Sequence, residues 1–102
     1  MSRRAARIDA NQPAIVHALR LAGCSVEHLH HVGEGCPDLL CAIAGDQTFL
    51  IEVKDGAKPL SEQALTKDQV VWHKRWRGKV HVVNSVDQAL AVVALYRARA
   101  AA

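Results

Sequence analysis

Two short segments near the middle of the sequence carry the residues best suited to chemistry. Asp38 follows Pro37, and Glu52 and Lys54 end an apolar stretch. Two carboxylates held 4 Å apart repel by roughly 4 kcal/mol at an effective dielectric near 20. A hard divalent cation such as Mg²⁺ prefers carboxylate oxygens and offsets this repulsion, while a nearby lysine can orient a water molecule or neutralise a phosphate. This combination of residue types is suited to phosphodiester hydrolysis.

Two expected strands would bring these residues together. Residues 39–43 form an apolar run, and residues 48–53 are rich in β-forming side chains. The turn between them contains Gly45, which can adopt positive φ. In such a hairpin, position 38 lies beside position 52 or 53, so the two carboxylates and the lysine converge at the end of the hairpin.

The alternation of side chains along a strand separates charge from core. Glu52 and Lys54 share one face of the second strand, while Phe49 and Ile51 share the other. A purely structural interpretation is also open. In it, Asp38 is a turn residue, and Glu52 and Lys54 form a surface ion pair that contributes little to stability.

The rest of the sequence predicts one α/β domain over residues 1–102. We expect a helix that starts at Asp9 or Asn11 and ends at Gly23, a strand over 24–32, the two strands of the hairpin, a polar loop over 55–64, a helix from Thr66, a strand over 80–83 and a final helix from Ser85. This order predicts a mixed, mostly four-stranded sheet flanked by helices. Residues 1–8 are expected to be a flexible basic arm, either frayed or touching phosphate, and residues 97–102 a frayed tail.

The helix after the polar loop combines a clear start signal with a basic end. Thr66 and Gln69 match a capping box, which gives Gln69 a structural role. We expect Val71 or Trp72, together with Trp76, to pack inward. A basic cluster follows, either a solvated face or a DNA contact, and consists of Lys74, Arg75, Arg77 and Lys79.

Composition narrows the functional class further. The formal net charge of +3 is compatible with nucleic acid as a partner. There is no apolar run long enough for a membrane span and no signal peptide, which predicts a cytoplasmic protein without a membrane partner.

Three scattered cysteines argue against a disulfide framework: Cys24 and Cys41 are expected in the core, and Cys36 beside the site. A zinc site among the histidines at 28, 30 and 31 is the less favoured interpretation.

The motifs resemble those of a known nuclease superfamily. Pro37-Asp38 followed by Glu52-Val53-Lys54 resembles the PD-(D/E)XK signature. Gly35-x-Pro37-Asp38-Leu39, the run from Ile51 to Gly56, and Leu65-Thr66-x-x-Gln69 are similar to small stand-alone VRR-NUC-type nucleases of bacteriophages and prophages. The similarity extends from about Asp9 to Leu90.

The resemblance implies a restriction-endonuclease-like core in the order αβββαβα and a Mg²⁺-dependent DNA endonuclease in which Mn²⁺ can substitute. It implies that Asp38, Glu52 and the backbone carbonyl of Val53 bind the metal, that Lys54 orients water or holds the scissile phosphate, and that Gln69 lies beside the active site. In such a nuclease, the expected DNA contacts are the basic cluster and Lys58, whose loop either folds over the substrate or is only a solvated surface loop. A homodimer is expected because two DNA strands require two sites. Branched or junction DNA is a candidate substrate.

One position departs from the resembled pattern. Related nucleases often carry a metal-facing glutamate on the first helix, whereas this sequence offers Asn11 and Gln12. Either amide could replace it only weakly. The alternative function is therefore a catalytically weak or inactive nuclease fold that binds DNA, while the intact Asp38, Glu52 and Lys54 favour an enzyme. The scattered cysteines and histidines leave a third, weaker alternative, a metal-responsive protein.

Overall fold

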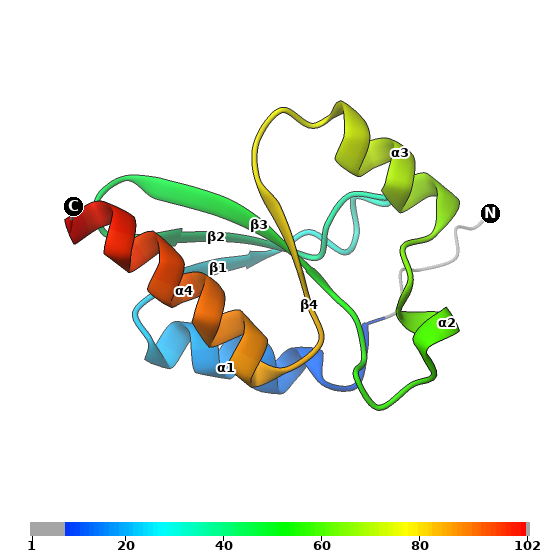
Figure 1. The fold of residues 1–102 in the computed structure, drawn as a ribbon, viewed down its shortest axis with the longest axis horizontal. Coiled ribbons are helices and arrows are strands. Elements are labelled where there is room, and N and C mark those ends of the chain that lie inside the picture. Colours follow the sequence, from blue (N-terminus) through cyan, green and yellow to red (C-terminus); the bar gives the residue numbers. More distant parts are fainter. Residues whose placement is uncertain (1–7, 102) are drawn as a thin grey trace.

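The structure of the protein is a computed structural model that describes residues 8–101. Its elements, in chain order, are α1 (Gln12–Leu21), β1 (Ser25–His28), β2 (Leu39–Ile43), β3 (Gln47–Val53), α2 (Leu60–Gln63), α3 (Lys67–Arg75), β4 (Val80–Val83) and α4 (Val86–Ala101). Figure 1 shows α1 and α4 lying together, with α3 standing at the other end of the molecule.

The four strands form one mixed sheet in the order β1-β2-β3-β4. β1, β2 and β3 pair antiparallel, and β4 runs parallel to β3. The parallel pair follows from the connection, because the chain leaves β3, passes through α2 and α3, and only then returns to the sheet. The predicted α/β fold, with a mixed four-stranded sheet in the order helix, three strands, helix, strand, helix, is confirmed, with α2 as an additional short helix.

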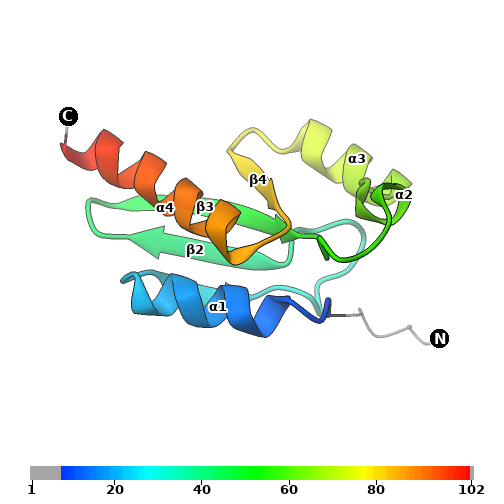
Figure 2. The same cartoon turned by 60° about the horizontal axis from the view of Figure 1, so that its bottom comes forward.

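The core lies between the sheet and the pair α1 and α4. Ile15 and Leu19 of α1, Leu39 and Ile51 of the central strands, and Val93 of α4 are at most 2% exposed. Figure 2 shows these two helices running along the sheet. Aromatic side chains are few, and the ring of Phe49 stacks on Tyr96 of α4 at 4.3 Å between centroids. The apolar face of β3 is therefore used for packing, and its opposite face carries Glu52.

The hairpin matches the sequence prediction closely. β2 and β3 pair in the register Leu39↔Ile51 and Cys41↔Phe49. Gly45 and Asp46 both adopt positive φ, at 91° and 61°. Glycine and aspartate adopt positive φ at lower cost than most residues, so these two positions suit the turn between Ile43 and Gln47.

Three predictions about elements are wrong. The strand expected over 24–32 ends at His28, and Val32 is 55% exposed, because the chain leaves the sheet to form the loop that leads to β2. The polar loop over 55–64 contains α2. The final helix continues to Ala101, so residues 97–101 are helical rather than frayed. The basic arm expected over residues 1–8 lies outside the described residues except for Ile8.

The inward packing expected for α3 is wrong for Val71 and Trp76, and Trp72 is only half-buried. Val71 is 61% exposed and Trp76 is 47% exposed. The Trp72 and Trp76 rings stack on each other instead, at 4.8 Å between centroids. Because α3 lies at the end of the sheet and not across its face, the sheet offers no apolar layer to cover them (Figure 1).

Candidate active site

The β2–β3 ladder ends where the two carboxylates meet. Extending the register beyond Leu39↔Ile51 places Asp38 opposite Glu52, and Pro37 opposite Val53. Proline has no N–H to donate, so the ladder cannot continue through it. The side chain of Asp38 supplies one hydrogen bond in place of the ladder: its Oδ2 accepts from the backbone N–H of Val53 at 2.7 Å. The site therefore lies at the end of the two central strands.

Burial keeps this pair of carboxylates from being fully ionised. Glu52 is 2% exposed. Burial, the charge of Asp38 and a hydrogen bond with its carboxyl group raise the pKa of Glu52 to about 9, against the opposing charge of Lys54. Burial also raises the pKa of Asp38, although the Val53 amide opposes this. The pair of carboxyl groups therefore tends to hold a shared proton near neutral pH.

Gln69 joins the lysine to the glutamate. Lys54, itself 8% exposed, donates from Nζ to Gln69 Oε1 at 2.7 Å. Gln69 Nε2 donates to Glu52 Oε2 at 3.0 Å. The Gln69 side chain thus bridges the Glu52 carboxyl group and the Lys54 ammonium group at the end of β3 and fixes their spacing.

The same glutamine also caps α3, as the sequence predicted. Gln69 Oε1 accepts from the Thr66 amide at 2.9 Å, and Thr66 Oγ1 accepts from the Gln69 amide at 3.2 Å. Both halves of the capping box are present. The start of α3 and the end of β3 are therefore held by one side chain.

Gly35 explains how α3 comes so close to the site. Its φ is +85°, and a Cβ at this position would lie 2.3 Å from the carbonyl oxygen of Asp68. The loop after β1 thus runs directly against the first turn of α3, as the two segments do in Figure 1. Only glycine allows this approach.

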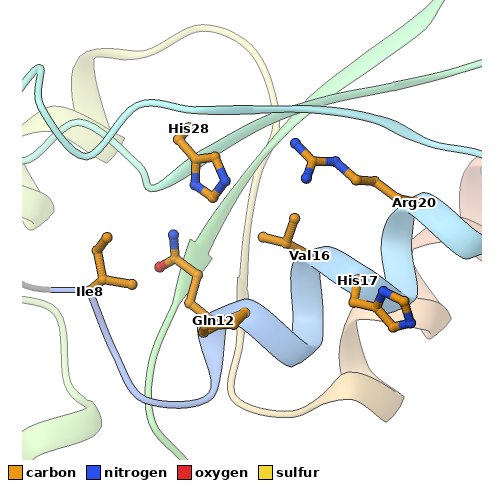
Figure 3. A pocket seen from close by; sticks show the side chains of 7 residues that line it. Ile8, Gln12, Val16, His17, Arg20 and His28 are labelled. Atoms are coloured by element: carbon orange, nitrogen blue, oxygen red, sulfur yellow. The ribbon is translucent and has the colours of Figure 1, made fainter.

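The start of α1 contributes Asn11 but not Gln12 to the end of β3. Asn11 Nδ2 donates to the carbonyl of Lys54 at 3.0 Å and to that of Asn84 at 3.1 Å, which ties α1 to the ends of β3 and β4. Asn11 precedes α1 without a side-chain capping bond. Gln12 lies instead beside His28 in a separate pocket (Figure 3).

Asp9 is an acidic neighbour that the sequence interpretation missed. Its negative charge contributes to the raised pKa values of Asp38 and Glu52. Asp9 Oδ1 also lies 3.8 Å from Lys58 Nζ. Lys58, expected as a DNA contact, is therefore paired with this carboxylate. The sequence signal for this role is the position of Asp9 at the expected start of the first helix.

His73 is a second missed neighbour. It follows Gln69 by one helical turn, so the two side chains share a face of α3. Its Nε2 is buried without a hydrogen-bond partner among the described residues. Burial and the charge of Lys54 lower the pKa of His73. The position of His73 one helical turn after Gln69 is the sequence signal that could have predicted it beside the site.

The remaining predicted residues divide into two groups. Cys36 is half-buried, and burial together with the charges of Glu52 and Asp38 raises the pKa of its thiol, which places it beside the site. The basic cluster of Lys74, Arg75, Arg77 and Lys79 is exposed at the far end of α3 and in the segment that follows it. The structure therefore does not join this cluster to the carboxylates.

The oxygen donors at the site fit a hard divalent cation. Glu52 Oε1 is buried and has no partner among the described residues. Two carboxylates face each other, and Pro37 cannot donate to the Val53 carbonyl. Such donors suit Mg²⁺, which binds through one or two carboxylates and keeps several waters. Within residues 8–101 no cluster of three or more His, Cys, Asp or Glu side chains could hold a metal, so the histidine zinc site finds no support there.

Comparison with known proteins identifies the fold. No protein-family model matches the sequence, and no curated protein matches it. A solved structure described as "VRR_NUC domain" has a TM-score of 0.63 and 28% sequence identity, and the match covers 83% of this chain and 91% of that chain.

This match indicates a nuclease-type domain. Its fold is that of the VRR-NUC type within the PD-(D/E)XK class, as the resemblance predicted. The helices within residues 8–101 are too short or too polar to span a membrane.

Proposed function

We propose that this protein is a metal-dependent DNA endonuclease that hydrolyses phosphodiester bonds. The observation that carries the proposal is the linked set at the end of β3: the paired carboxylates Asp38 and Glu52, joined through Gln69 to Lys54. The match to a VRR_NUC domain supports the same class of chemistry.

The metal would be held by Asp38, Glu52 and the carbonyl of Val53, with Mg²⁺ as the natural ion and Mn²⁺ as a substitute. When bound, such an ion lowers the pKa of a coordinated water and stabilises the charge that develops on the phosphate. Glu52 must give up its proton to act as a ligand, so the cation and the proton compete for it.

Lys54 has the freedom to act on the substrate. Its ammonium group has three N–H donors, and Gln69 accepts one of them. The other donors can orient a water or contact a phosphate oxygen. Gln69 acts as a positioning residue, because it holds Lys54 and Glu52 and also caps α3.

DNA is the proposed substrate, and branched or junction DNA the proposed preferred form. The net charge of +3 and the exposed basic cluster support an anionic polymer as partner. We also propose a homodimer, with one site for each strand, acting in the cytoplasm of a bacterium or of a phage-infected cell.

A cleavage assay tests this function directly. Linear, flapped and four-way junction DNAs are incubated with the protein in Mg²⁺, Mn²⁺, Ca²⁺ or EDTA. We expect cutting in Mg²⁺ and Mn²⁺, binding without cutting in Ca²⁺, and no cutting in EDTA. Equal cleavage in EDTA would remove the metal mechanism.

A second candidate is a DNA-binding module with little or no cleavage activity. It is favoured by the first helix, where Asn11 bonds to backbone carbonyls and supplies no carboxylate. Under this alternative, all four metal conditions give binding and none gives products.

A further inference from the structure

A pocket of about 370 Å³ lies beside α1, next to the site described above. Its apolar walls come from Ile8, Pro13 and Val16. Figure 3 shows its polar side chains, which come from α1 and from the end of β1. The volume is within the range of about 300–1,000 Å³ that small-ligand sites occupy.

Two polar groups in the pocket lack partners. Gln12 is 1% exposed, and its Nε2 has no hydrogen-bond partner among the described residues. The Nδ1 atom of His28 is also buried without a partner there. Figure 3 shows the Gln12 amide and the His28 ring close together in the middle of the pocket, with Ile8 on one side and Val16 and Arg20 on the other. Buried polar groups are normally hydrogen-bonded, so this part of the pocket is suited to a ligand with its own donors and acceptors.

The end of the pocket formed by Arg20 is cationic. Arg20 lies one helical turn after Val16, and its Nη2 donates to the Val26 carbonyl at 3.0 Å. Because a guanidinium has five N–H donors, others remain for an anion. The described lining residues include no carboxylate. A ligand with an anionic group at one end and a polar, flat group at the other matches this arrangement.

Two pocket residues are joined along the chain to residues that contact the site. Gln12 follows Asn11, whose side-chain amide donates a hydrogen bond to the Lys54 carbonyl. His28 precedes Leu29, whose N–H donates to the Asp38 carbonyl at 2.8 Å. A strand that reaches Asp38 and Lys54 therefore passes close to the pocket.

We propose that the pocket takes one unstacked nucleotide of the DNA, with its base between the apolar walls against Gln12 and His28 and its phosphate beside Arg20. This rests on the proposed function, since it assumes that DNA reaches the carboxylates. Every base has donors and acceptors along its edge, and pockets for extruded bases use such polar contacts between apolar walls.

Binding in EDTA tests the pocket without cleavage. The probes are two single strands of equal length and charge, one of thymidine nucleotides and one of abasic deoxyribose phosphates. We expect the wild-type protein to bind the base-containing strand at least about tenfold more tightly, which is the order of discrimination that paired hydrogen bonds provide. Equal affinity for the two strands overturns the proposal.

A pair of matched variants assigns this preference to the pocket. Gln12→Leu replaces the amide with an apolar group of similar size, and Ala14→Leu places the same leucine on α1 at an exposed position outside the pocket. Gln12→Leu should lose most of the preference while binding the abasic strand as the wild type does, and Ala14→Leu should keep it. Melting curves establish that both variants fold. A Gln12→Leu protein with the full preference overturns the proposal, because the base then stacks elsewhere, for example on Trp76.

Cleavage assays separate this inference from the proposed function. A wild-type protein that cuts DNA in Mg²⁺ but shows no preference for bases refutes the pocket and leaves the nuclease standing. A preference that depends on Gln12, in a protein that never cuts, refutes the nuclease and supports the pocket.

Discussion

Glu52 shows how a single residue can be costly to the fold and useful to the site. It is almost fully buried beside a second carboxylate, with one oxygen unpartnered among the described residues. Burial beside a second carboxylate disfavours the ionised form of Glu52 more strongly than the charge of Lys54 favours it. The residue is therefore a poor choice for stability alone, which argues that Glu52 and Asp38 serve a ligand.

The raised pKa of Glu52 predicts a pH dependence of stability in the absence of metal. Its pKa is about 9 in the folded protein and near 4.5 when unfolded, so the folded state binds more protons between these values. Stability then falls as pH rises through this window. Glu52→Gln removes the titration, and at pH 8 in EDTA it should be more stable than the wild type by on the order of a few kcal/mol. Thermal melts from pH 5 to 9 measure this.

The control for that experiment is Glu27→Gln, because Glu27 is exposed on β1. It should melt in parallel with the wild type at every pH. If Glu52→Gln also follows the wild-type curve, Glu52 does not carry the proton and the account of the site is wrong.

Lys54 is expected to act on the rate rather than on affinity. Lys54→Met keeps the apolar stem but removes the charge, and it should reduce cleavage at saturating DNA by about a hundredfold or more, as removal of an electrostatic catalyst typically does. Lys67→Met is the matched control, since Lys67 is exposed at the start of α3, and it should keep the wild-type rate. Single-turnover rates decide: a normal rate with weak binding would make Lys54 only a phosphate anchor.

At the scale of elements, the contact between α3 and the loop after β1 holds the site together. α3 packs no buried side chain against the sheet. Its first turn is instead fixed by the Thr66–Gln69 capping box and by the close approach of Gly35 to Asp68. The position of Gln69, and hence of Lys54, depends on this small contact.

Two glycines in one loop allow this dependence to be measured. Gly35→Ala introduces both backbone strain, at φ +85°, and a clash with Asp68. Gly33→Ala introduces similar strain at φ +76°, but nothing lies within 4 Å of the added Cβ. Gly35→Ala should therefore destabilise the protein by about 1–3 kcal/mol more than Gly33→Ala, as overpacking does, and it should also lower the cleavage rate. Denaturant unfolding of both variants tests the difference, and equal destabilisation would show that α3 simply moves away.

For the whole molecule, the sequence predicted what depends on local pattern. The alternation in β3 and the turn residues Gly45 and Asp46 specified the hairpin, and the hairpin brought Asp38 to Glu52. The features that the sequence could not predict depend on contacts between segments that are far apart in the chain. Trp76 was expected in the core because an apolar residue on a helix indicates a covered face, but the sequence does not say whether a sheet lies under that face. The approach of Asp9 to the carboxylates likewise depends on how the start of α1 meets the end of β3.

The distribution of charge over the molecule gives the last prediction. Lys79 belongs to the exposed basic cluster beyond α3, while Arg99 is outside that cluster, in the last turn of α4 and over the Tyr96 ring. If DNA crosses the site along α3, Lys79→Gln should weaken binding and reduce the slope of log affinity against log salt by close to one unit, because one phosphate contact releases about one counterion. Arg99→Gln changes the net charge equally and should leave the slope unchanged. Binding titrations in Ca²⁺ over a range of salt concentrations measure both, and equal slopes for the two variants would mean that the cluster is only a solvated surface.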